Sequence, residues 1–137
     1  MLNIQSIYNL LNASSKASDR ATGIRLANEI EDLSLLIMPP APPPVWECCA
    51  EILYNKSDAE LEPYLDSLLE WLYDLNWPGA GIILDRLKKI PGRKMIVPFL
   101  NAYKKGENES EIYGAKWHCN LSELLENTEL KDSLDIM

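Results

Sequence analysis

The residues in this sequence best suited to chemistry or recognition are four carboxylates spaced four positions apart. They are Glu62, Asp66, Glu70 and Asp74. Residues at this spacing are neighbours on a helix, so the four side chains form one column if the segment is helical. Like charges at this spacing oppose helix formation by roughly 0.2–0.5 kcal/mol per pair, and no Lys or Arg three or four residues away in the segment offsets them. The column therefore needs either solvent or a cationic partner.

The column has two interpretations, solvated surface or a face that recognises a basic protein. Trp71 and Tyr73 flank it, and aromatic residues beside charges are typical of binding hot spots; for Trp71, plain core packing is the other interpretation. Two more carboxylates continue the pattern in the preceding segment. We predict a partner-binding face made of Glu47, Glu51, Glu62, Asp66, Glu70, Trp71, Tyr73 and Asp74.

Catalysis by this column is not expected. Acid–base chemistry needs environments that separate two pKa values, and an exposed column offers four similar carboxylates. We therefore predict a non-enzymatic protein with no catalytic residue. One alternative remains open, a small-molecule site or enzyme pocket formed by Trp71, Asp74, Asn76, Trp77 and His118.

The cysteines and the single histidine do not form a metal or redox motif. They occur as two adjacent pairs, Cys48-Cys49 and His118-Cys119. Neighbouring residues on a helix point about 100° apart, so adjacent pairs make poor ligand sets. We interpret Cys48 and Cys119 as small buried apolar residues. No cofactor or metal is expected.

Composition places the chain among ordinary globular proteins. Its 137 residues are 47% hydrophobic and 25% charged, with a formal net charge of −8. The acidic balance argues against nucleic-acid binding by phosphate neutralisation. No apolar run approaches the roughly 18 residues of a membrane span, and no basic segment opens a signal peptide. An odd cysteine count without a signal peptide fits a reducing compartment, so a cytoplasmic location is expected.

Positive charge is concentrated in one strip. Seven basic residues and no acidic one lie from Arg86 to Lys105. The simplest interpretation is a solvated cluster at helix C-termini, where cations are favourable. The alternative is self-association, in which the 86–105 strip of one copy meets the acidic column of another and forms a homo-oligomer.

Helical periodicity dominates the elements that must position these residues, and strand signals are scarce. The spacing predicts helices over 4–11, from Ser18 or Asp19 to 30, and over 45–54, 57–75, 78–90, 96–106 and 110–127. Ser57 and Glu60 have the spacing of a capping box. Prolines between 39 and 44 predict a stiff connector. In the last helix the candidate core is Ile112, Ala115, Cys119, Leu121, Leu124 and Leu125.

The sequence also repeats itself. Pro63-Tyr64-Leu65 returns as Pro98-Phe99-Leu100, and Pro78-Gly79-Ala80 is matched by Tyr113-Gly114-Ala115, both 35 residues later. A period near this length with two helices per unit is typical of helical repeats. Gly79 and Gly114 would then let paired helices approach closely. We predict an all-α fold, a short HEAT-like helical-repeat stack of six to seven helices over residues 1–127, followed by a loose acidic tail at 128–137.

The stretch from Val45 to Leu87 resembles a bacterial family of small, uncharacterised helical proteins. The mark of that family is a Leu-Glu-Trp-Leu-x-Asp-x-Asn-Trp-Pro core after a Lys-Ser-Asp turn, and this sequence carries both, at 69–78 and 56–58. The resemblance implies HEAT-type repeats. It also implies an immunity-type inhibitor, which binds a basic toxin and occludes it. The core has a structural interpretation as well, in which Trp77-Pro78 begins a helix, Asp74 or Asn76 caps it, and the tryptophans wedge between helices.

Overall fold

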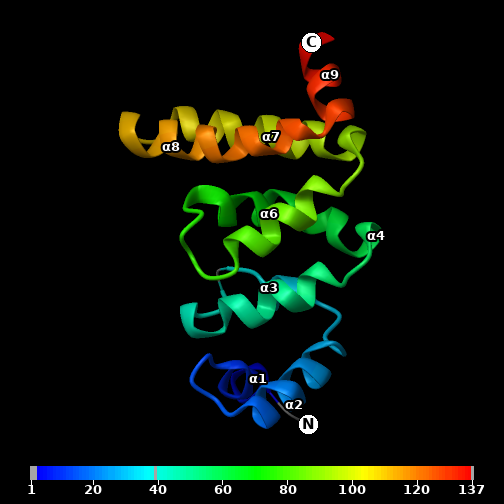
Figure 1. Ribbon diagram of the computed structural model, residues 1–137, viewed down its shortest axis with the longest axis vertical. Helices are drawn as coiled ribbons and strands as arrows, with labels where there is room; N and C mark the ends of the chain where they lie inside the picture. Colours follow the sequence, from blue (N-terminus) through cyan, green and yellow to red (C-terminus); the bar gives the residue numbers. More distant parts are fainter. Residues whose placement is uncertain (1–2, 39, 137) are drawn as a thin grey trace.

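The computed structural model describes residues 3–38 and 40–136, and the helices of this part form an elongated stack with the two chain ends at opposite poles (Figure 1). No strand occurs in the described ranges. The prediction of an all-α stack is therefore confirmed. Pro39, in the predicted proline connector, lies outside the described residues.

The first part of the stack pairs α1 (Ile4–Leu11) with α2 (Ala17–Ala27). Two 3₁₀ turns, η1 (Leu33–Leu36) and η2 (Pro43–Val45), then lead into α3 (Trp46–Tyr54). Prolines suit the first turn of a helical segment because their missing N–H has no helical acceptor there. The connector is thus partly helical rather than extended throughout.

The predicted helix over 57–75 forms with a break in it. It consists of α4 (Asp58–Leu61), the 3₁₀ turn η3 (Glu62–Tyr64), α5 (Leu65–Glu70) and the 3₁₀ turn η4 (Trp71–Tyr73). Pro63 has no N–H to donate to the preceding turn, and the helix tightens there. At the N-terminus the capping box is present as predicted, because Ser57 accepts from the Glu60 N–H and Glu60 accepts from the Ser57 N–H.

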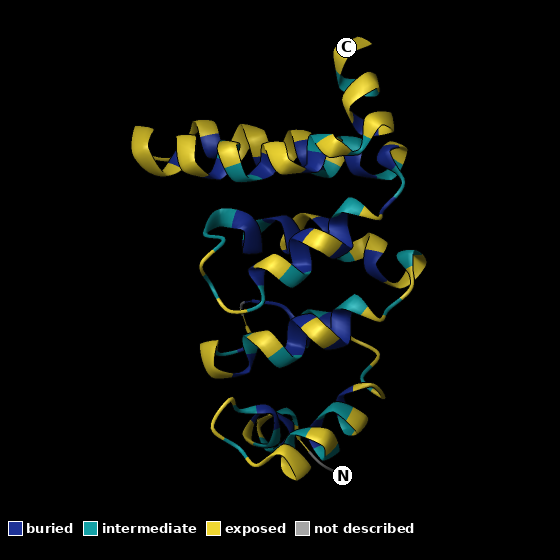
Figure 2. Cartoon of the chain, viewed as in Figure 1, coloured by how far each residue is buried: buried dark blue, intermediate teal, exposed yellow. Residues whose placement is uncertain are grey.

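Four helices complete the chain. They are α6 (Ala80–Lys88), α7 (Gly92–Glu107), α8 (Glu111–Ser122), which continues as the 3₁₀ turn η5 (Glu123–Glu126), and α9 (Thr128–Ile136). The stack has two layers: α3 packs on α6 and α5 packs on α7, with α6 lying in front of the α4–η4 segment in Figure 1. Buried residues face inward between these layers (Figure 2).

Both glycines of the 35-residue repeat allow close approach. A Cβ on Gly79 would lie 2.8 Å from the Ala50 Cβ, and one on Gly114 would lie 2.3 Å from the Gly106 carbonyl oxygen. Gly79 has an additional constraint, a φ of 83°, which glycine adopts at little cost. This turn delays α6, which begins at Ala80 rather than at the predicted Pro78.

Two predictions near the C-terminus are wrong. Residues 128–136 form a helix, not a loose tail. The Asn127 side chain accepts from the Leu130 N–H and donates to the Ile90 carbonyl, and the Leu130 side chain is fully buried. These contacts hold the segment against the rest of the chain. In α8 the predicted core positions Ile112, Ala115 and Cys119 are exposed. The buried face is instead Gly114, Trp117, Leu121 and Leu124.

Candidate functional site

The acidic column lies along the α4–η4 segment, whose α5 packs against α7. Three of its four carboxylates form ion pairs with lysines of later helices. The pairs are Glu62–Lys94 at 3.4 Å, Glu70–Lys105, and Asp74–Lys116 at 3.8 Å. These partners could not be found by spacing within the helix, because each cation lies more than thirty residues away along the chain. Much of the column's charge is thus balanced inside the chain.

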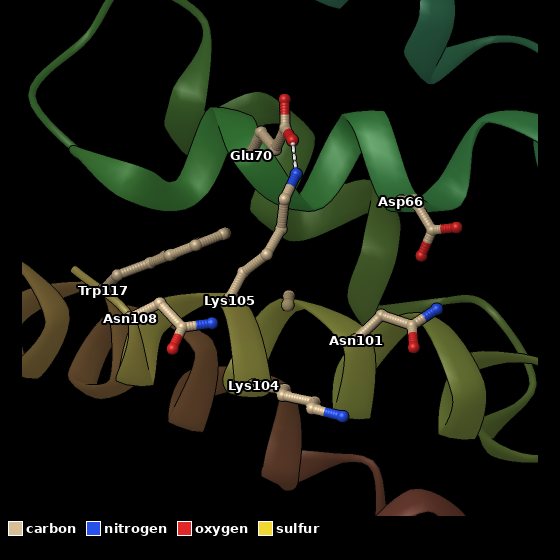
Figure 3. Close-up of a pocket in the computed structure, with 8 residues that line it drawn as sticks. Asp66, Glu70, Asn101, Lys104, Lys105, Asn108 and Trp117 are labelled. Atoms are coloured by element: carbon tan, nitrogen blue, oxygen red, sulfur yellow. Dashed lines mark hydrogen bonds and ion pairs between the residues drawn. The ribbon is translucent and has the colours of Figure 1, made fainter.

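Asp66 is the member of the column that has no ion pair within the described ranges. It is exposed and lies on one wall of a groove of about 390 Å³ between α5 and α7 (Figure 3). The opposite wall is polar, with Asn101 and Lys104 from α7 and Asn108, which caps its C-terminus. The Lys105 side chain crosses the groove to reach Glu70, as the dashed line in Figure 3 shows.

A second cavity of about 270 Å³ adjoins the groove and shares Glu70, Lys105 and Trp117 with it. Its remaining lining consists of Met38, Tyr73, Trp77 and Glu109. We call it the aromatic pocket. The Tyr73 ring lies 5.8 Å from Trp77, nearly parallel to it, and 5.6 Å from Trp117. Loss of solvent raises the pKa of the Tyr73 hydroxyl, and the nearby Glu109 and Tyr113 raise it further.

Trp71 does not belong to a partner-binding face. Its side chain is fully buried, and its Nε1 donates to the Pro78 carbonyl at 3.0 Å. Tyr73, two residues later, is half-buried and does line the aromatic pocket. Of the two predicted aromatics, one is therefore core and the other is accessible. Sequence reasoning missed Trp117 and Glu109, which α8 and the turn before it bring to the same pocket.

The two halves of the predicted face are separate. Glu47 and Glu51 are exposed on α3, and Glu51 lines a shallow cavity together with Asp85 of α6. No member of the acidic column lines that cavity. The structure thus offers two acidic areas, one on α3 and α6 and one along the groove.

The basic strip supplies partners within the chain. Arg86 is buried, contrary to the expectation of a solvated cluster, and donates to the Asp58 carboxylate at 2.6 Å and the Lys56 carbonyl at 2.9 Å. Other cations of the strip pair with the acidic column or with the C-terminal helices, as Lys88–Glu126, Arg93–Glu129, Lys94–Glu62 and Lys105–Glu70. The acidic column and the 86–105 strip are therefore joined by ion pairs within one chain, whereas the self-association alternative required pairs between two copies.

The cysteines and the histidine have different surroundings and share no site in the described part of the chain. Cys49 is buried, and burial raises the pKa of its thiol to about 12. Cys48 is half-buried and Cys119 is exposed, so the expectation that both are buried is wrong. His118 stacks on Tyr103 with ring centroids 3.7 Å apart. Among the described residues no cluster of His, Cys, Asp and Glu is suited to hold a metal.

The alternative pocket does not assemble from its predicted members. Trp71 is buried in the core, and the His118 Nε2 is hydrogen-bonded to the Tyr103 carbonyl at 2.7 Å, so this nitrogen carries the proton. Asp74 accepts from the Asn76 N–H and pairs with Lys116. Trp77 alone of the five lines a described cavity.

In the described ranges, no helix has the length and apolar character needed to cross a bilayer.

Comparison with known proteins gives one finding. Residues 47–109 match the family model of a domain of unknown function (DUF5071). The matched range includes the acidic column, the Trp71–Pro78 turn and the whole of α7. No curated protein and no solved structure matches the chain. The match covers the residues that line the groove except Trp117, and the family description names no activity.

Proposed function

We propose that the chain is a non-enzymatic binding module that recognises a basic protein surface through the groove between α5 and α7. The observation that carries the proposal is the exposed acidity that remains after internal pairing. The six ion pairs among the described residues each join one carboxylate to one cation. The net charge of −8 therefore lies outside the pairs, where seven cations accompany 15 carboxylates. Asp66 and Glu109 are two such carboxylates, and both line the cavities described above.

The character of the cavities supports protein recognition over catalysis. The walls combine carboxylates, amides and two lysines with aromatic rings, a mixture of charged, polar and aromatic groups that protein interfaces with a hot spot also show. Every buried side-chain polar atom in the described part of the chain has a hydrogen-bond partner. An acidic surface speeds association with a basic partner and disfavours acidic ones.

An affinity capture tests this proposal. The chain is immobilised and exposed to lysate of its source organism at low salt, and retained proteins are identified by mass spectrometry. The groove variant Asp66→Lys/Glu109→Lys is compared with Asp132→Lys/Asp135→Lys, which makes the same charge change on α9. We expect a basic protein that the wild type and the α9 variant retain and the groove variant loses.

A third variant, Glu47→Lys/Glu51→Lys, distinguishes the two acidic areas. Loss of the partner from this variant alone places recognition on α3 and contradicts the groove. Equal retention by all variants shows that none of these carboxylates recognises the partner, and equal loss from all of them leaves only non-specific charge attraction. Either result contradicts the proposal.

An immunity-type inhibitor of a basic toxin is the specific form of this function that the family resemblance implies. It requires occlusion of a toxin site without chemistry by this chain. Titrating the captured protein with the wild-type chain tests it, because an inhibitor abolishes the partner's activity at about one chain per partner. A partner that stays fully active when saturated contradicts inhibition.

A further inference from the structure

The aromatic pocket has an accessible tryptophan. Of the four indole nitrogens, those of Trp46, Trp71 and Trp117 donate to backbone carbonyls. The Trp77 nitrogen has no hydrogen-bond partner within the described ranges, and its ring is half-buried beside Tyr73. Trp77 also lies near Trp46 and Tyr73 near Tyr113, with ring centroids 5.7 and 6.3 Å apart, yet both residues remain partly exposed. The pocket therefore presents the part of this aromatic surface that the internal ring contacts leave open.

Negative charge borders this surface. Glu70 and Glu109 both line the pocket, and the raised pKa of the Tyr73 hydroxyl, due first to loss of solvent, also reflects the closeness of Glu109. A cation near aromatic faces is attracted by the electron-rich rings, and nearby carboxylates add to that attraction.

We propose that the aromatic pocket receives one arginine side chain of the partner, with the guanidinium against Tyr73 and Trp77 and paired with Glu70 and Glu109. This inference rests on the proposed function and names the group that anchors the partner. The pocket volume, about 270 Å³, lies below the range of pockets for drug-sized ligands and suits a single side chain. Arginine fits better than lysine because its planar group stacks on rings and binds carboxylates through two N–H groups.

Lys105 is the internal cation at this position. It lines both cavities and pairs with Glu70, yet its side chain remains 62% exposed. Exposed ion pairs are weak and exchange readily. The arriving guanidinium therefore takes Glu70 from Lys105, and the lysine swings into solvent.

A small probe tests the pocket without knowledge of the partner. N-acetyl-L-arginine methylamide is titrated into the ¹⁵N-labelled chain, and the four indole N–H signals are followed by NMR. We expect saturable shifts of the Trp77 and Trp117 signals, with smaller changes at Trp46 and Trp71. The citrulline analogue has the same shape without the charge, and it should produce no saturable shift at the same concentrations.

Matched variants separate the pocket from general electrostatics. Glu109→Gln is expected to weaken probe binding about threefold, whereas Glu107→Gln, which removes the same charge from exposed α7 surface, leaves it unchanged. Lys105→Met should strengthen binding about threefold because it frees Glu70, and Lys104→Met, which lines only the groove, should not.

Several results overturn the inference. Equal shifts with the citrulline analogue remove the role of charge, and equal effects of the matched variants remove the role of the pocket. If the probe fails while the groove variant still loses a captured basic protein, the arginine anchor is wrong and the binding module stands. If the probe binds but capture does not depend on the groove, both the proposed function and a partner arginine in this pocket are wrong.

Discussion

Gly79→Ala is the most informative single change in the fold because its cost follows from two structural features. The residue has a φ of 83°, and a non-glycine residue in this region costs roughly 1–2 kcal/mol. The added Cβ would also lie 2.8 Å from the Ala50 Cβ and 2.9 Å from the Trp46 carbonyl oxygen. Overpacking of this kind costs about 1–3 kcal/mol.

We expect the free energy of unfolding to fall by about 3 kcal/mol in total. For a chain of this size that loss lowers the Tm by roughly 10 °C. The assay is urea unfolding at 25 °C, followed by far-UV circular dichroism and by tryptophan fluorescence, whose coincidence tests two-state behaviour.

Gly81→Ala is the matched control two residues later. No atom lies within 4 Å of the Cβ position at Gly81, and the residue is inside α6. The same substitution there should stabilise the chain by about 0.5 kcal/mol, because alanine loses less backbone entropy in a helix. A Gly79→Ala loss below about 0.5 kcal/mol would refute the reasoning about φ and close packing.

Two further predictions concern buried groups. Arg86→Met should lower the free energy of unfolding by about 2–3 kcal/mol, because it leaves the Asp58 carboxylate and the Lys56 carbonyl without their donor. The control Lys88→Met, at an exposed pair, should cost under about 1 kcal/mol. Equal losses for the two variants in urea unfolding would contradict the role of burial. The pKa of the Cys49 thiol is raised from about 9 in the unfolded chain to about 12 in the fold, so the stability that its burial contributes is complete below pH 9. Above that pH only the unfolded chain loses the proton. The free energy of unfolding therefore falls by roughly 1.4 kcal/mol per pH unit as the pH rises toward 12. Cys49→Ala should therefore lose less stability than the wild type over that range, and iodoacetamide at neutral pH should label Cys119 long before Cys49 when followed by mass spectrometry. A Cys49 that reacts as fast as Cys119 in the folded chain would show that the thiol is not protected.

Local patterns were sufficient to predict most of the fold. The capping box at Ser57 and Glu60 and the apolar spacing after it placed the α4–η4 segment correctly, because those signals act within a few residues. The same kind of reasoning missed α9, although Asn127 is a normal N-cap residue and its bond to the Leu130 N–H is local. The segment after that cap is rich in charged residues, and its one buried leucine is a weak signal of packing.

The candidate site was harder to predict because its contacts are long-range. The pairing of Glu70 with Lys105, and the position of Trp117 over Leu69, depend on how α7 and α8 pack on α5. In α8 the pattern Ile112, Ala115, Cys119 is as helical as Gly114, Trp117, Leu121, and only packing decides which face is buried. Trp71 and Tyr73 could not be separated for the same reason.

The ion pairs of the α4–η4 segment run in order along the chain, and this order has a consequence for folding. Asp58, Glu62, Glu70 and Asp74 meet Arg86, Lys94, Lys105 and Lys116 in turn. A slip of α7 by one helical turn would move Lys94 and Lys105 away from Glu62 and Glu70 and leave those two carboxylates without their cations. Exposed pairs add little to stability, but mismatched charges are costly. The order of the ion pairs thus disfavours other docking registers. In a chain with repeated, similar helices, it favours the docking of each helix on its own neighbour.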